Sequence, residues 1–265
     1  MDFSKVGRIA AETDDQSVEK SFTRELPAAG AALMRFVGYL ETGRHKPLNP
    51  KHKPALKTML IFELSTPKHK IAMEGVKVPQ KFTLRLNKGI TGTSGYKKVF
   101  NQMNKATGGG HTHFFQMLGK PLMGEIFHKD NGKEGAEKKT YANLDDAGAF
   151  SFKAPQSVDP LTDTVTPIPV EEVHGELQGF LWENESTTDA DYVTMWNSLF
   201  IDGTREKDGK EVSKNWLQET IMSNMEWEGS TCQALTQEHI SLDDLETSSV
   251  DLAATAVADD KPLEM

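Results

Sequence analysis

Alternating apolar and polar residues in two stretches constrain the fold of this chain more than any other sequence feature. Residues 56–64 and 81–87 each place an apolar side chain at nearly every second position. The residues between them are polar or charged in 81–87, and in 56–64 they are Lys57, Met59, Ile61 and Glu63. A period of two is typical of a β-strand that has one face in a hydrophobic core and the other in water. The residues expected to face the core are Leu56, Leu60, Phe62, Leu64, Phe82, Leu84 and Leu86.

A third stretch, residues 33–40, follows the same pattern less regularly. It predicts a strand with Met34, Phe36 and Leu40 facing inward and with Val37 among the outward residues. Together the three strands present an outward face that is cationic and contains one aromatic ring. Cations neutralise phosphates and an aromatic ring stacks on a base, so this face is predicted to bind single-stranded nucleic acid. Its members are Arg35, Tyr39, Lys57, Lys81 and Arg85.

The segment between the first two strands, residues 44–57, contains five Lys or Arg residues, two histidines, three prolines and no acid. The prolines exclude a helix or a central strand and favour an extended loop. An ordinary solvated loop is one interpretation. The exclusion of acids beside a basic sheet face favours a loop that contacts phosphates. The further DNA-binding residues predicted from this segment are Arg44, Lys46, Lys51 and Lys53. Lys88, at the end of the third strand, is predicted to bind DNA as well.

Charge is distributed unevenly, although the net charge of −9 over 265 residues by itself argues against a nucleic-acid ligand. Residues 43–120 contain 15 Lys or Arg against two acids, a balance of +13. From residue 226 to the end there are ten acids against one base, a balance of −9. A basic region followed by an acidic end predicts an anionic ligand together with a regulatory or partner-binding tail. The last residues, from about 241, hold few large apolar groups and are expected to be disordered.

The order of the expected elements indicates a fold class. Ser94 is predicted to cap a helix over residues 95–106, with Tyr96, Val99, Phe100 and Met103 facing the core. Strands are expected at residues 122–128 and, in two pieces, at 141–155. Three strands, a helix and two strands form the order of an OB fold, a five-stranded Greek-key barrel that binds oligonucleotides on strands two and three. The predicted class is therefore mainly β with helices (α+β).

Four segments are predicted along the chain. Residues 1–26 form an N-terminal arm, and residues 27–155 form the OB-fold single-strand-binding core. Residues 156–230 form an appendage, with a strand at 176–183 and helices at 188–200 and 213–227 whose apolar stripes dock onto the barrel. Residues 231–265 form an acidic disordered tail.

The sequence predicts neither a catalytic centre nor a cofactor. His111 and His113 alternate, but two histidines without a third ligand of fixed position do not define a metal site. The single Cys232 excludes an internal disulfide and a multi-cysteine zinc site. A metal-dependent nuclease would need clustered carboxylates, which the basic region lacks. This nuclease stays open as one alternative, and a structural or assembly protein of a virion stays open as another, because an acidic end and a polar surface also suit a particle.

The chain carries no sequence signal for a membrane or for export. No apolar run approaches the roughly 18 residues of a membrane span, and the N-terminus lacks the apolar centre of a signal peptide. No membrane partner is therefore expected, and a cytoplasmic location is predicted.

Five short segments between residues 27 and 230 carry a family resemblance. They are PAAG (27–30), FVGYLETG (36–43), FEL (62–64), KNWLQETI (214–221) and WEGS (227–230). In them the chain resembles the OB-fold single-stranded-DNA-binding proteins that phages encode. The resemblance implies coating and protection of single strands, independent of sequence, during phage DNA replication and recombination in the cytoplasm of an infected bacterial host.

The same resemblance implies a role for the acidic end of the chain. Such binders recruit replication, recombination or transcription proteins through an acidic tail with an apolar tip. The matching residues here are Asp259, Asp260, Leu263 and Met265, and the usual terminal aromatic residue is absent.

Overall fold

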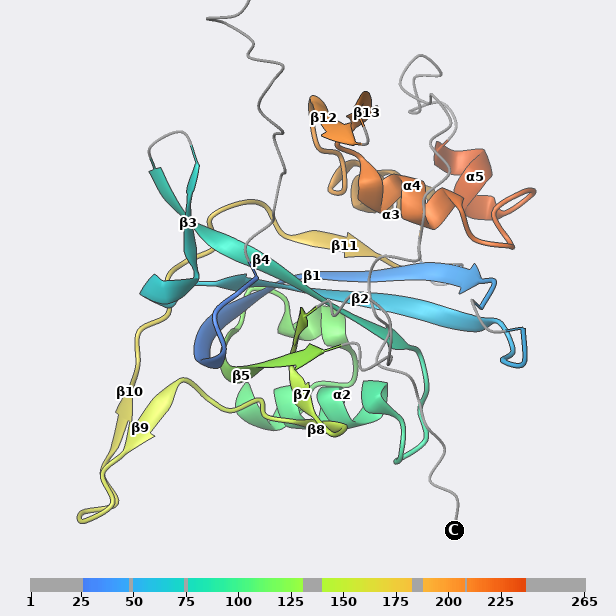
Figure 1. Ribbon diagram of the computed structural model, residues 1–265. Helices are drawn as coiled ribbons and strands as arrows, with labels where there is room; N and C mark the ends of the chain where they lie inside the picture. Colours follow the sequence, from blue (N-terminus) through green and yellow to red (C-terminus); the bar gives the residue numbers. More distant parts are fainter. Residues whose placement is uncertain are drawn as a thin grey trace, which may run out of the picture.

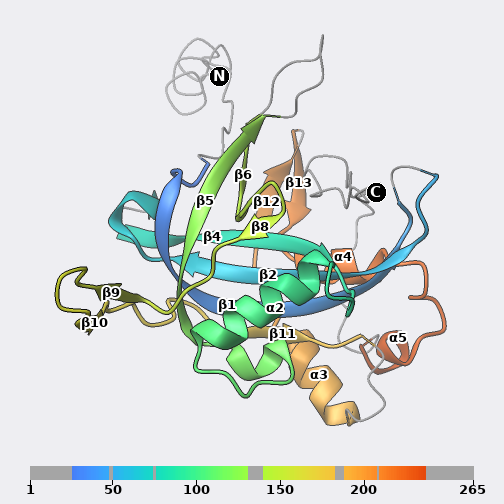
Figure 2. The same ribbon diagram turned by 90° about the horizontal axis from the view of Figure 1, so that it is seen from below.

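The computed structural model of the chain describes residues 26–47, 50–73, 76–130, 140–182, 188–207 and 209–236. Its central element is a mainly antiparallel sheet that curls into a half-barrel (Figures 1 and 2). The strand order is β3-β4-β2-β1-β5-β6, and β11 runs parallel to β1. These strands are β1 (Gly30–His45), β2 (Ala55–Leu64), β3 (Lys70–Met73), β4 (Val76–Asn87), β5 (Pro121–Asp130), β6 (Thr140–Asn143) and β11 (Gln178–Phe180).

Helices lie on both sides of this sheet (Figure 1). One side, which we name the inner face, is covered by α2 (Gly95–Ala106) and the 3-10 helix η2 (Phe114–Met117). The other side, the outer face, is covered by α3 (Asp189–Asn197), α4 (Trp216–Met222) and α5 (Thr231–Thr236). The fold is thus mainly β with a few helices, which is compatible with an OB-like α+β class. None of the described helices is long and apolar enough to cross a membrane.

The inner core confirms the alternation expected for β2 and β4. Its members include Leu60, Phe62 and Leu64 of β2 together with Phe82, Leu84 and Leu86 of β4. Leu56 is the exception, since it contacts the outer core instead. The predicted helix is confirmed as well: Ser94 Oγ accepts a hydrogen bond from the Lys97 amide at 3.2 Å, and Tyr96, Val99, Phe100 and Met103 are buried.

A second hydrophobic core lies on the outer face. β1 and β2 contribute Val37, Leu40, Met59 and Ile61 to it. The C-terminal part of the chain supplies the opposite half of this core: Phe180, Tyr192, Trp196, Leu199, Leu217, Ile221, Trp227 and Cys232. The two predicted helices therefore dock onto the sheet, as expected. Because they do so on the outer face, much of β1 and β2 is buried on both sides.

A β-bulge in β1 overturns the orientation predicted for Tyr39. Phe36 pairs with Phe62 and Gly38 pairs with Ile61, so Val37 is an extra residue on β1. One extra residue reverses the in-and-out phase of everything that follows it. Tyr39 consequently joins the inner core with no exposed surface, and Leu40 turns to the outer core. The prediction of Tyr39 as an outward residue is wrong for this reason.

Several short elements were not predicted. The expected fifth strand is divided among β6 and the hairpin of β7 (Asp145–Asp146) and β8 (Ala149–Phe150). The first residues of the predicted appendage contain a hairpin of β9 (Gln156–Val158) and β10 (Val165–Pro167). A third hairpin, β12 (Thr204–Lys207) and β13 (Lys210–Ser213), precedes α4, and the 3-10 helix η1 (Pro67–His69) precedes β3.

The domain boundaries need two corrections. Residues 231–236, assigned to a disordered tail, form α5, and the side chains of Cys232 and Thr236 are buried. Residues 178–180, assigned to the appendage, pair directly with β1 in the main sheet. The N-terminal arm up to residue 25 and the tail from residue 237 lie outside the described residues.

The helices α3, α4 and α5 with the segments between them form a layer on the outer face, which we name the C-terminal layer, and Gly43 of the sheet contacts it. Replacement of Gly43 by Ala should destabilise the fold by about 2 kcal/mol or more. Its φ is +83°, and a Cβ there would lie 2.5 Å from Cγ of Asn224. Asn224 has little freedom to move, because its side chain bonds to the Ile221 carbonyl at 2.6 Å and to the Glu226 amide at 2.7 Å.

Gly148 provides a matched control for this substitution. Its φ is +82°, but a Cβ there would meet nothing within 4 Å. Gly148→Ala should therefore carry only the backbone strain, about 1 kcal/mol. Urea unfolding of both variants measures the difference. Equal losses would mean that the contact between Gly43 and Asn224 has no structural importance.

Candidate nucleic-acid interface

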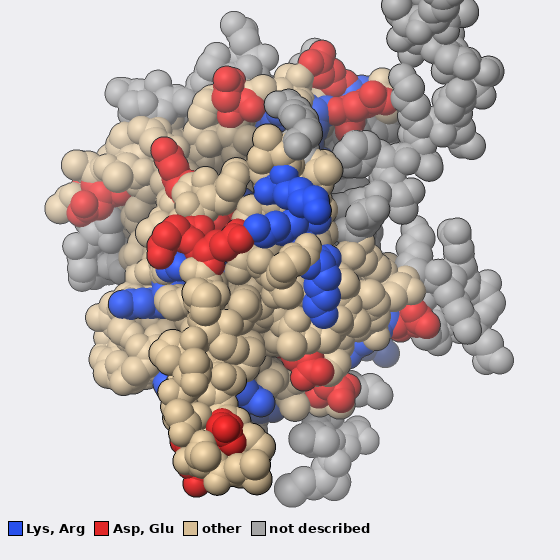
Figure 3. Space-filling view, turned by 90° about the vertical axis from the view of Figure 1, so that its left-hand side faces the viewer, with Lys and Arg blue, Asp and Glu red and all other residues tan. Residues whose placement is uncertain are grey.

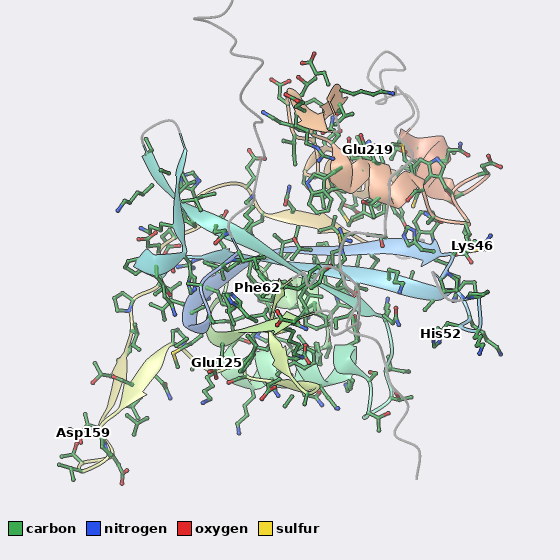
Figure 4. The ribbon with its side chains drawn as sticks, viewed as in Figure 1. Lys46, His52, Phe62, Glu125, Asp159 and Glu219 are labelled. Carbon is green, nitrogen blue, oxygen red and sulfur yellow. The ribbon has the colours of Figure 1, made fainter. Side chains whose placement is uncertain are left out.

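The loop between β1 and β2 gathers cations at one end of the sheet. Figure 4 shows Lys46 and His52 beyond the ends of the two strands, at the extremity of the molecule. No Asp or Glu occurs from residue 43 to residue 62, so the loop itself supplies no neutralising charge. We name this surface the basic end. Its exposed members are Arg44, Lys46, Lys51, His52 and Lys53.

Arg44 is the member of the basic end that contacts the C-terminal layer. Its Nε lies 3.2 Å from a carboxylate oxygen of Glu226, and its carbonyl accepts a hydrogen bond from the Met225 amide at 2.8 Å. Both charged side chains are about half exposed. An exposed pair of this kind contributes at most about 1 kcal/mol, so a phosphate can compete with Glu226 for the guanidinium.

Two of the predicted strand cations, Lys57 and Arg85, are half-buried near His45. The His45 ring lies 2.9 Å from the Thr42 carbonyl oxygen. Burial lowers the pKa of His45, the hydrogen bond to Thr42 opposes this, and the charges of Lys57 and Arg85 lower the pKa further. Burial also lowers the pKa of the Arg85 guanidinium. At neutral pH His45 is therefore uncharged, and it adds no cation to the interface.

Lys81 lies on the outer face, as predicted, but beside an acid. Its Nζ is 3.9 Å from a carboxylate oxygen of Glu63, the residue opposite it on β2. The Glu63 side chain is only 3% exposed, and its other oxygen accepts a hydrogen bond from the His174 amide at 2.8 Å. Lys81 therefore balances a buried carboxylate, which reduces the charge that it offers to a phosphate.

Arg35 was predicted to contact DNA, and the structure contradicts this. Its guanidinium donates hydrogen bonds to the carbonyls of Gly119, Val170 and Glu171 at 2.6–2.9 Å, and it pairs with Glu172 at 3.2 Å. The residue is 8% exposed. Arg35 thus fastens the segment after β10 to the sheet, and no phosphate can reach it without displacing that segment.

Tyr39 was predicted to stack on a base, and its position excludes this. Its ring stacks on Phe114 with centroids 5.4 Å apart, inside the inner core. Its hydroxyl donates to Glu41 at 2.8 Å and lies 2.8 Å from the hydroxyl of Tyr96. Burial raises the pKa of Tyr39, and the Glu41 charge raises it further. Burial likewise raises the pKa of Tyr96 to about 12. The hydroxyls of Tyr39 and Tyr96 and the carboxylate of Glu41 thus form a buried polar cluster.

Lys88 belongs to the same cluster rather than to a DNA-binding face. Its Nζ lies 2.6 Å from a carboxylate oxygen of Glu41, whose side chain is 4% exposed. His113 contributes a second nitrogen 3.8 Å from that oxygen. A carboxylate held inside a core needs a partner cation, since an uncompensated buried charge is strongly destabilising. Lys88 therefore serves as the partner cation of the buried Glu41 carboxylate.

The C-terminal layer covers the middle of the predicted cationic face. The middle of the outer face carries Val37, Met59 and Ile61, and α3 and α4 bury these side chains. The predicted cations that remain exposed and clear of a buried carboxylate lie at the basic end, beyond this layer. The structure thus separates the loop residues Arg44, Lys46, Lys51 and Lys53 from Arg35, Tyr39 and Lys88, which have structural roles.

The opposite end of the molecule has a mixed charge pattern. In Figure 3, which views the side that bears β3 in Figure 1, blue and red groups lie next to one another. Lys70 of β3 pairs with Glu171, and Lys68 donates a hydrogen bond to the Ala29 carbonyl at 2.7 Å. This side therefore lacks the uniform positive charge of the basic end.

His52 is a member of the basic end that the sequence prediction left out. The signal was present, since His52 lies between Lys51 and Lys53 in a loop without acids.

Among the described residues, no group of three or more His, Cys, Asp or Glu side chains is placed to hold a metal ion. The predicted partner-binding residues Asp259, Asp260, Leu263 and Met265 lie outside the described part of the chain. Comparisons with protein families, curated proteins and solved structures found no match.

Proposed function

We propose that this chain binds single-stranded DNA without sequence preference, and that it does so through the basic end. The observation that carries the proposal is the exposed loop between β1 and β2, in which every charged residue is a cation. Cations on an exposed loop neutralise a flexible phosphate backbone without reading bases.

The strand order supports an OB-like barrel as the scaffold. If β1, β2, β4, β5 and β6 are taken as the five strands, the first three form an antiparallel meander, β5 returns beside β1, and β6 pairs with β5. In OB folds the loop between the first two strands is one of those that hold oligonucleotides. The basic end occupies that position, and the resemblance to phage single-strand binders points the same way.

His52 takes the place that Tyr39 was expected to fill. Single-strand binders stack bases on rings, and imidazole is among the rings that do so. The His52 side chain is exposed between two lysines whose charges attract the phosphates on either side of a base. A short, exposed ring of this kind suits an unstacked strand better than a duplex groove, which an α-helix or a β-ribbon enters.

A competition titration tests the proposal. The full chain is titrated with single-stranded DNA, duplex DNA and RNA of one length, at several salt concentrations, with fluorescence anisotropy as the readout. Tighter binding of the DNA single strand than of the duplex is expected. If Lys46, Lys51 and Lys53 each contact one phosphate, the log-log salt slope should be about −2, from roughly 0.7 per contact. No binding to any of the three ligands would favour the virion-assembly alternative.

Substitution of the loop lysines should flatten this salt slope. Lys46→Ala, Lys51→Ala and Lys53→Ala should each reduce it by about 0.7, and His52→Ala should weaken binding by about 1–3 kcal/mol with the slope unchanged. Lys98→Ala and Lys105→Ala on α2 serve as controls, because these residues are exposed but lie on the other side of the sheet. Equal losses in the control variants would show that the charge of the whole molecule, rather than the basic end, attracts DNA.

A further inference from the structure

The β9–β10 hairpin projects from the body as an arm (Figures 1 and 2). We name residues 156–167 the arm. Every residue of the arm is exposed, including the strand residues of β9 and β10. An isolated two-stranded hairpin is marginally stable in water, because it has no layer to pack against. A hairpin that keeps its apolar residues in water is therefore a candidate for contact with another molecule.

The body holds both ends of the arm. On the side before β9, Lys153 and Met123 exchange two backbone hydrogen bonds of 2.8 and 2.9 Å. The Ile168 amide donates to the Pro155 carbonyl at 2.8 Å and closes the base of the hairpin. After β10, the Arg35 guanidinium holds the carbonyls of residues 170 and 171. The direction in which the arm projects is thus fixed.

The tip of the arm is ordered by its own hydrogen bonds. An oxygen of the Asp159 carboxylate accepts from the amides of Leu161 and Thr162 at 2.8 and 3.3 Å, and the Asp163 amide donates to the Asp159 carbonyl at 2.9 Å. This arrangement keeps Leu161 93% exposed. Val158 and Val165, which face each other across the two strands, are 53% and 52% exposed. A surface ordered before binding loses little entropy when a partner docks.

The charge of the arm is complementary to that of the basic end of the same molecule. The arm contains Asp159 and Asp163 and no Lys or Arg. Figure 4 places Asp159 at one extremity of the molecule and Lys46 at the other, and Figure 2 likewise shows the arm opposite the β1–β2 loop. The basic end also has an apolar neighbour, since Met225, bonded to the Arg44 carbonyl, is 59% exposed.

We propose that the arm of one molecule docks onto the basic end of a second copy of this chain. Asp159 and Asp163 would lie against the loop cations, and Leu161 would contact Met225. Because the two surfaces differ and lie at opposite ends, the contact is head-to-tail and extends into an open chain of molecules. The association needs no DNA, so it goes beyond the proposed function and can fail or hold independently of it.

The test uses sedimentation velocity of the full chain without DNA, at low and at high salt. The wild type should associate with rising concentration, and more strongly at low salt, where the charges are least screened. An arm variant, Asp159→Asn with Asp163→Lys, should weaken association about tenfold or more, because the arm then carries a positive charge. The asparagine oxygen can still accept the two amide hydrogen bonds that order the tip. Leu161→Ser, which leaves the charge unchanged, should also weaken it. All three positions are exposed and lie outside both cores, so the melting temperature should stay unchanged and serves as the check on folding.

A mixing experiment tests the head-to-tail geometry. The arm variant keeps a normal basic end, and a loop variant, Lys46→Glu with Lys53→Glu, keeps a normal arm. Each should be monomeric alone, whereas an equal mixture should form a dimer that grows no further. Short single-stranded DNA should bind the arm variant at least as tightly as the wild type, because the basic end is intact and no neighbouring arm competes for it. This result separates the present proposal from the proposed function.

Three results would overturn the proposal. They are a wild type that stays monomeric under all conditions, an arm variant that associates like the wild type, and a mixture that stays monomeric. Association that responds to deletion of residues 241–265 but not to the arm variant would identify the acidic C-terminal segment, rather than the arm, as the occupant of the basic end.

Discussion

Replacement of Lys88 by Met is expected to lower the free energy of unfolding by about 3 kcal/mol, because it leaves the Glu41 carboxylate buried without its closest cation. The ion pair joins Lys88 Nζ to Glu41 at 2.6 Å, with 4% of the Glu41 side chain exposed. The Tyr39 hydroxyl still donates to the carboxylate at 2.8 Å, but a neutral donor compensates a charge only in part. Urea unfolding at neutral pH measures the loss.

Two further variants isolate the buried pair in this experiment. Lys98→Met removes an exposed lysine of α2 and should change stability by less than about 0.5 kcal/mol. Glu41→Gln combined with Lys88→Met should recover part of the loss, because Gln still accepts from Tyr39 without carrying a charge. If the double variant lost more free energy of unfolding than its two single variants lose together, the ion pair would not be the cause.

The pH dependence of stability follows from the same carboxylate. Burial raises the pKa of Glu41, but its contacts with His113 and Lys88 outweigh burial and hold the pKa below the ordinary value of 4.5. A carboxylate with a lowered pKa stabilises the fold above its unfolded-state pKa, and this stabilisation is lost as the pH falls through the folded-state pKa. Below about pH 4.5 the wild type should therefore lose stability more steeply than Glu41→Gln. Parallel curves would show that Glu41 does not titrate differently on unfolding.

Replacement of Trp196 by Ala should be at least as damaging, at about 3–5 kcal/mol. Trp196 is 1% exposed at the centre of the outer core, where its ring lies 5.7 Å from that of Trp227 and 5.9 Å from that of Phe180, measured between centroids. Its truncation leaves a cavity between α3 and the sheet. The variant should also aggregate on warming, because loosening of the C-terminal layer exposes the apolar outer face of β1 and β2.

Phe200→Ala is the matched control for Trp196→Ala. Phe200 lies just after the same helix but is 56% exposed, so its truncation should cost about 1 kcal/mol or less. Thermal unfolding of both variants, followed by tryptophan fluorescence and by circular dichroism, makes the comparison. A small effect of Trp196→Ala would mean that the C-terminal layer contributes little to the stability of the sheet.

These two sites bear on the proposed interface, since both restrict which cations are exposed. The cluster around Glu41 retains Lys88, and the outer core covers the middle of the sheet. The loop residues stay accessible because they lie past the ends of β1 and β2, outside the area that the C-terminal layer covers. Binding at the basic end therefore requires no rearrangement of either core.

Features that depend on neighbouring residues could be read from the sequence. The alternation in β2 and β4, the Ser94 cap with the apolar stripe of α2, and the accessibility of the acid-free loop all hold in the structure. Each follows from backbone geometry or composition within about a dozen residues. The hairpin of the arm is an exception, because its short strands carry few apolar residues and its turn is ordered by Asp159 rather than by glycine.

The sequence by itself thus determined the long strands β1, β2 and β4, the helix that covers the inner face, and the segregation of positive charge into the region after residue 43. Only the tertiary structure decided which of those charges remain exposed. The extra residue at Val37 turned Tyr39 inward. The guanidinium of Arg35 donates hydrogen bonds to carbonyls about 135 residues away in the chain. The alternation of residues predicts which side chains share a face of a strand, but it does not predict which distant segments cover that face. The outcome therefore depended on the register of β1 and on which distant segments pack against the sheet.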